Sequence, residues 1–167
     1  MLTTLGRTAQ IALRRLAGIC LVALALLTLA DVVGRYVLNY SIVGAVEMTE
    51  MLMVGVIFAG IVLATIAHEH VAVDLVTLHM DGSVRRAQRI ASNLLATGIS
   101  LLLAAATWTQ AESALDFGDQ TTMLGMPLAP VIFFMCAMLL VNALVHGWQT
   151  WEVIVGKDTI ANKDTYD

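Results

Sequence analysis

Four long stretches of the chain are almost free of charged side chains, and their lengths restrict the fold more than any other feature. They run from Leu16 to Gly34 with one interruption at Asp31, from Met51 to Ala67, from Ile90 to Ala111 and from Thr121 to Trp151. An α-helix needs about 20 apolar residues to cross a hydrocarbon core of roughly 30 Å. All four stretches reach that length once the second is extended back toward Glu47. The sequence therefore predicts four membrane-spanning helices.

The composition agrees with this prediction. Of the 167 residues, 59 % are hydrophobic and 13 % are charged, against roughly 45–50 % and 25 % in soluble domains. A soluble domain of this size would need more polar side chains to cover its surface. We therefore expect an all-α integral membrane protein with a single membrane domain over residues 1–167, and with helices at approximately 12–36, 46–68, 88–112 and 126–150.

The basic residues predict how the helices are oriented, because Lys and Arg are retained in the cytoplasm during insertion. Eight of the nine lie before the first, between the second and third, or after the fourth predicted helix: Arg7, Arg14, Arg15, Arg85, Arg86, Arg89, Lys157 and Lys163. Arg35 is on the other side, together with Asp31, Glu47, Glu50, Glu112, Asp116 and Asp119. We expect both termini in the cytoplasm and an acidic outer face, which is not the charge pattern of a nucleic-acid-binding protein.

The first stretch has an alternative interpretation as a cleaved signal peptide. A basic segment precedes it, and the small residues Ala23 and Ala25 resemble those around a cleavage site. However, the apolar run continues past Ala25, and Asp31 stands four residues before Arg35, where opposite charges on a helix face each other. This pair favours an intact helix that ends near Arg35.

The densest cluster of chemically active side chains follows the second predicted helix. It contains His68, Glu69, His70, Asp74 and His79. Haem ligation requires facing histidines, so His68 or His70 with His146 leaves open a haem-binding membrane anchor subunit of a respiratory complex. The spacing matches no strong zinc pattern. We expect interfacial polar groups here, with no catalytic residue, no metal and no cofactor.

A stand-alone exporter is a further alternative. Transporters usually mark their pathway with intramembrane polar groups or broken helices. The four apolar stretches have no charged residue near their centres, and we interpret them as lacking intramembrane polar residues. The sequence therefore predicts that the chain does not transport by itself.

Several short motifs follow one another in a defined order. Arg35-Tyr36 ends the first helix, Glu47 opens the second, Gly60 lies in its middle, and His70-x-x-x-Asp74 comes after it; Thr122-Met-Leu-Gly125-Met-Pro127 precedes the fourth helix. Over roughly residues 15 to 150 the chain thereby resembles the small membrane subunit of tripartite ATP-independent periplasmic (TRAP) transporters. It departs from the pattern at two positions, because Gly44 and His68 stand where many members have Trp and Gly.

The resemblance implies a scaffold role beside two protein partners. In that family a large permease subunit carries the sodium and substrate sites, and a periplasmic substrate-binding protein delivers an organic acid. By this resemblance the chain is a multi-pass protein of the bacterial inner membrane, in contact with membrane lipids, which takes part in sodium-coupled carboxylate import. The candidate partner-contact or interfacial residues are Arg35, Glu47, Glu50, His70 and Asp74.

Glu47 has two interpretations. It could contact the permease or the binding protein, or it could be a first-turn carboxylate that the positive end of the helix dipole favours. Glu50 lies three residues later and can project from the same face. Because Arg35 is close by in the predicted topology, these three side chains could form a local ion-pair cluster.

The topology can be tested with reporter fusions. We expect fusions after Tyr40 and after Asp119 to report the periplasm, and fusions after Ser83 and at the C-terminus to report the cytoplasm, because of the uneven distribution of Lys and Arg. A periplasmic C-terminus would contradict the predicted orientation.

Overall fold

The computed structural model describes residues 2–67 and 82–155, and these residues form four α-helices. The helices are α1 (Leu2–Val37), α2 (Ala45–Ile66), α4 (Gly82–Asp116) and α5 (Ala129–Val155). Each contains a segment long and apolar enough to cross a membrane, which confirms the expected all-α membrane protein with four spanning helices. Which ends face the cytoplasm stays a prediction, and His68, His70, Asp74 and His79 lie outside the described residues.

The helix bounds differ from the expected ones for identifiable reasons. α1 has 36 residues and α4 has 35, so each is roughly 50 Å long at 1.5 Å per residue and extends beyond a hydrocarbon core of roughly 30 Å. α5 begins at Ala129 and not at residue 126. Pro130 therefore lies in the first turn, which tolerates a missing N–H, whereas Pro127 forms a β-bridge with Gln120 in the preceding loop.

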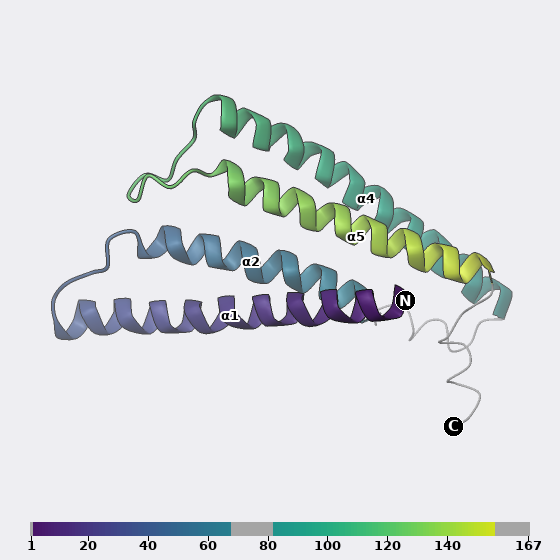
Figure 1. The fold of residues 1–167 in the computed structure, drawn as a ribbon, viewed down its shortest axis with the longest axis horizontal. Coiled ribbons are helices and arrows are strands. Elements are labelled where there is room, and N and C mark those ends of the chain that lie inside the picture. Colours follow the sequence, from purple (N-terminus) through teal and green to yellow (C-terminus); the bar gives the residue numbers. More distant parts are fainter. Residues whose placement is uncertain (1, 68–81, 156–167) are drawn as a thin grey trace, which may run out of the picture.

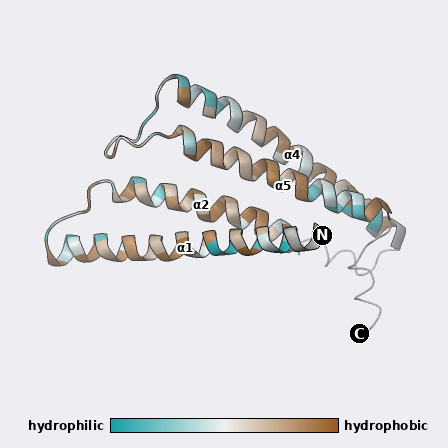
Figure 2. Cartoon of the chain, in the orientation of Figure 1, coloured by the Kyte–Doolittle hydropathy of each residue, from teal (hydrophilic) through white to brown (hydrophobic). Residues whose placement is uncertain are grey.

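The helices are arranged side by side in the order α1, α2, α5, α4 (Figure 1). The extensive helix contacts are those of α1 with α2, α2 with α5, and α5 with α4. We call this arrangement the helix row. Neighbours in a row bury only the sides that they share, so many apolar side chains stay exposed, and Figure 2 shows hydrophobic residues along all four helices. Such a surface suits lipid as the solvent.

Small side chains lie where neighbouring helices approach closely. A Cβ added to Gly55 of α2 would come within 3.1 Å of the Cys20 sulfur on α1. Ala59 and Val62 of α2 are completely buried. Between α4 and α5, Ala104 packs with Cys136 and Leu139. Lipid is as apolar as these side chains, so burying them does not drive the helices together. Van der Waals packing between closely spaced backbones is one of the few interactions that can hold the row together.

Two glycines of α2 give a matched test of this packing. Gly55→Leu would push α1 away from α2, and overpacking of this kind typically costs about 1–3 kcal/mol. Gly60→Leu adds the same side chain where a Cβ meets nothing within 4 Å. We expect the thermal stability of the full chain in detergent to fall for Gly55→Leu and to change little for Gly60→Leu. Equal losses would contradict the observed α1–α2 interface.

Candidate functional site

Two loops meet at one end of the helix row. Residues 38–44 connect α1 to α2, and residues 117–128 connect α4 to α5; both lie at the end where α2 begins (Figure 1). We call this the loop end. Each loop is fixed by a carboxylate of a neighbouring helix, as the contacts of Asp31 and Glu47 show.

Asp31 fixes the α1–α2 loop. Its carboxylate accepts hydrogen bonds from Arg35 Nη2 at 2.8 Å, from the backbone N–H of Ile42 at 3.1 Å and from the Ser41 hydroxyl at 3.3 Å. The expected pairing of Asp31 with Arg35 is therefore confirmed. The loop also folds tightly over Gly34, whose carbonyl accepts the N–H of Tyr40 at 3.0 Å. A Cβ at Gly34 would lie only 2.8 Å from the Tyr40 carbonyl oxygen, so this close turn requires glycine.

Glu47 fixes the α4–α5 loop. Its two carboxylate oxygens accept the backbone N–H groups of Met123 at 2.6 Å and Leu124 at 2.9 Å. The Leu124 side chain packs directly over Gly44, the residue before α2, where an added Cβ would lie 2.5 Å from Leu124 Cγ. Gly44 also has a φ of +76°, which favours glycine. The tip of the α4–α5 loop is thus seated on the first turn of α2.

The loop presents these amides because it is folded as a small hairpin. Thr121 and Met126 bond to each other twice: the Thr121 N–H donates to the Met126 carbonyl at 2.9 Å, and the Met126 N–H donates to the Thr121 hydroxyl at 3.0 Å. Gly125 turns the chain with a φ of +63°. Its N–H group donates to the Thr121 carbonyl at 3.1 Å within the hairpin, whereas the N–H groups of Met123 and Leu124 donate to the Glu47 carboxylate.

These contacts change the interpretation of the expected ion-pair cluster. Arg35 pairs with Asp31, Glu47 binds loop amides, and Glu50 is exposed; within the described residues no ion pair joins Arg35 to either glutamate. The expected cluster was wrong, because Arg35 is paired with Asp31 and the Glu47 carboxylate binds the loop amides. That Arg35, Glu47 or Glu50 contacts a partner stays a prediction, and the structure does not describe His70 and Asp74.

A second group of polar residues is buried between α2, α5 and α4. The Thr65 hydroxyl donates to Asn142 Oδ1 at 2.7 Å, and Asn142 Nδ2 donates to the Ser100 hydroxyl at 3.0 Å. Gln149 Nε2 donates to the Thr65 carbonyl at 2.7 Å. His146 lies beside them, with its Nε2 3.4 Å from the Thr65 hydroxyl oxygen. All five side chains are at most 7 % exposed. We call these five residues the buried polar cluster.

The buried polar cluster contradicts the expectation that the helices lack intramembrane polar residues. Part of it could have been found in the sequence, because Asn142, His146 and Gln149 are separated by four and three residues and so share one helix face. Thr65 and Ser100 gave no such signal, since an isolated hydroxyl is common in membrane helices. The hydrogen bonds of Thr65, Asn142, Ser100 and Gln149 run between α2, α5 and α4, which makes the cluster a link between helices.

His146 is the one residue of the haem alternative that the structure describes. It is 3 % exposed and contacts Thr65, whereas His68 and His70 lie outside the described residues. Over residues 2–67 and 82–155, no group of three or more His, Cys, Asp and Glu side chains is placed to hold a metal ion.

The contribution of the buried polar cluster can be measured at Asn142, which bridges α2 and α4. Asn142→Ala removes two side-chain hydrogen bonds, and interhelical bonds in membranes contribute about 0.6 kcal/mol on average and up to about 1.7. We expect a loss of roughly 1–3 kcal/mol in unfolding free energy, and a coupling with Thr65→Ala in a double-mutant cycle. Thr107→Ala is the control, because the Thr107 hydroxyl bonds to its own helix at the Leu103 carbonyl. Additive effects of Asn142→Ala and Thr65→Ala would contradict the observed bond.

Comparison with known proteins adds a family assignment to this geometry. Residues 24–154 match the family described as tripartite ATP-independent periplasmic transporters, DctQ component. The matched region contains Asp31, Glu47, the α4–α5 loop and the whole buried polar cluster. Neither the curated proteins nor the solved structures gave a match.

Proposed function

The chain belongs to the DctQ component of the tripartite ATP-independent periplasmic transporters, and we propose that it serves as the scaffold subunit beside a large permease subunit. Membership makes it an inner-membrane component of a transporter and not a member of an enzyme family. The finer assignment, which concerns what this chain does inside the complex, has to be argued from its geometry.

The helix row is the observation that carries the proposal. A pathway for a polar solute must be walled from lipid on every side, because unsatisfied polar groups in hydrocarbon are costly. The four described helices contact one another in the sequence α1, α2, α5, α4, and the hollows that they form are open grooves. A row of this kind offers broad apolar faces to a partner, and its four described helices do not enclose a pathway of their own.

The position of the polar groups supports the same proposal. Within the described residues, the charged side chains lie toward helix ends, and Thr65, Asn142, Ser100 and Gln149 of the buried polar cluster bond to one another. Solute sites in transporters usually leave such groups free to bind the solute. We therefore assign the substrate and sodium sites to the large permease subunit, and we propose an organic acid as substrate, delivered by a periplasmic binding protein.

Glu47 has a definite role in this proposal. It positions the α4–α5 loop, which lies at the end predicted to face the periplasm, where the binding protein would dock. The side chain of Met123 at the loop tip is 69 % exposed and is available to a partner. In this view Glu47 acts on partner contacts through the loop that it holds.

Uptake by the assembled transporter tests the proposal. We expect no uptake by the reconstituted chain alone, and loss of uptake when this chain is removed from the complex. Glu47→Gln leaves a single acceptor oxygen for two loop amides, so it should weaken co-purification with the large subunit or binding-protein-dependent uptake. Glu50→Gln makes the same change at an exposed position three residues away and should behave like wild type.

The outcomes separate the parts of the proposal. Transport by the chain alone would overturn the scaffold role. Wild-type assembly and uptake by Glu47→Gln at matched expression would remove the role of the loop and leave the scaffold role intact.

A further inference from the structure

We propose that the groove between α4 and α5 binds one anionic phospholipid, with an acyl chain along the groove and the phosphate at Arg86. This inference does not rest on the proposed function, because it concerns a surface of the isolated chain. It is carried by the shape of the groove, by the charge at its mouth and by the aromatic residues beside that mouth.

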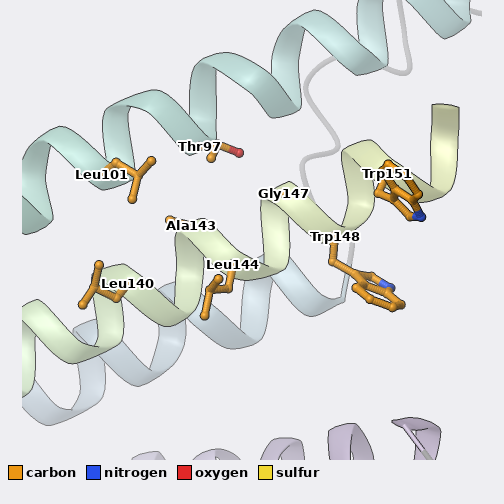
Figure 3. A pocket seen from close by; sticks show the side chains of 8 residues that line it. All are labelled: Thr97, Leu101, Leu140, Ala143, Leu144, Gly147, Trp148 and Trp151. Carbon is orange, nitrogen blue, oxygen red and sulfur yellow. The ribbon is translucent and has the colours of Figure 1, made fainter.

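The groove is long, apolar and open because small residues form part of its wall. It has a volume of about 710 Å³ and lies between Thr97 and Leu101 of α4 and Ala143, Gly147 and Trp151 of α5 (Figure 3). A Cβ at Gly147 would meet nothing within 4 Å. The Thr97 hydroxyl bonds to the Asn93 carbonyl of its own helix. The Thr97 hydroxyl therefore does not need a polar group of a ligand as its partner, and the groove suits an apolar occupant.

Arg86 provides a positive charge beside Ile154, about one helical turn beyond the groove residue Trp151. Its Nη2 donates to the carbonyl of Ile154 at 2.9 Å, and Ile154 lies seven residues, or two helical turns, after Gly147 on the same face of α5. The Arg86 side chain is exposed. A guanidinium has five N–H donors, so the bond to Ile154 leaves several for a phosphate while it holds the side chain in place.

Among the described residues, the acidic and aromatic groups near Arg86 leave its charge available for a headgroup. Glu152 is the acidic residue of α5 in this region; it accepts the Trp148 indole N–H and lines a separate hollow with Ile66 of α2. Trp148 and Trp151 are 54 % and 63 % exposed, and such rings prefer the headgroup layer of the bilayer. Their position places the mouth of the groove at the depth of lipid phosphates.

These features together favour a lipid with a negative headgroup over a neutral one. Basic pockets between membrane helices recognise anionic headgroups, and each Lys or Arg near the surface contributes enough for about a five-fold change in affinity. The Arg85, Arg86 and Arg89 segment is also predicted to face the cytoplasm, where it would meet the inner leaflet. A helix of a partner protein would fill the apolar part of the groove but has no general need for Arg86.

The experiment uses tryptophan quenching in the full chain. The chain is placed in detergent with increasing amounts of brominated phosphatidylglycerol or brominated phosphatidylcholine, whose bromine atoms quench nearby indole rings. We expect phosphatidylglycerol to bind about five-fold more tightly, and Arg86→Gln to remove that difference. Arg14→Gln removes an exposed basic residue of α1, at the far edge of the row, and should keep it.

A second pair of variants tests the groove. Gly147→Leu fills it without a clash and should reduce quenching by both lipids, whereas Gly18→Leu makes the same change at an open position on α1 and should not. Equal affinity for the two lipids in the wild type, or an unchanged preference in Arg86→Gln, overturns the proposal. So does disappearance of the lipid signal when the chain is purified with its large subunit, because the groove would then belong to a protein partner.

Discussion

The contact between α2 and α5 is the interaction on which the rest of the structure depends. α1 packs on α2, and α4 packs on α5, so these helices form two pairs that are joined through α2 and α5. In lipid, apolar burial does not drive helices together as it does in water. Thr65 therefore has a central position, because its hydroxyl bonds to Asn142 and its carbonyl accepts Gln149. An unpaired polar side chain would cost free energy in lipid. The bonds of Thr65 avoid that cost and hold the two helix pairs in register.

A second polar link joins the same two helix pairs at the other end of α2. Glu47 lies in the first turn of α2 and holds the loop between α4 and α5, whereas Thr65 lies in the last turn. The two residues are 18 positions apart, which is roughly 27 Å along a helix. Links at both ends of α2 restrict rotation of one pair against the other much more than a single link would. The arrangement fits the proposed scaffold role, because a scaffold has to keep its shape.

Local features of the fold could be predicted from the sequence, and long-range ones could not. Uncharged stretches of about 20 residues are sufficient to identify membrane helices, and the spacing of Asp31 and Arg35 is sufficient to identify their pairing. The partner of Glu47 is different, because it consists of backbone N–H groups that are 76 and 77 residues away. Any residue contributes such a group, so the sequence has no side-chain signal for it. Ser100 and Thr65 were missed for a related reason, since their role appears only when three helices come together.

The open row also explains why apolar exposure is a property to be expected here. In water, exposed residues such as Leu101, Leu140 and Leu144 would promote aggregation, but in a bilayer the same side chains are solvated by lipid. Lipid acyl chains, however, make only apolar contacts with such a surface. The surface becomes selective for a particular ligand where it has a fixed charge or where a glycine leaves space. On the α4–α5 face Arg86 supplies the charge and Gly147 the missing side chain. On α2, a Cβ at Gly60 would likewise meet nothing within 4 Å, but no charged residue is described beside it. A glycine without a neighbouring charge favours the close approach of another helix. By this argument Gly147 lies on a face that suits a lipid, and Gly60 lies on a face that suits another helix.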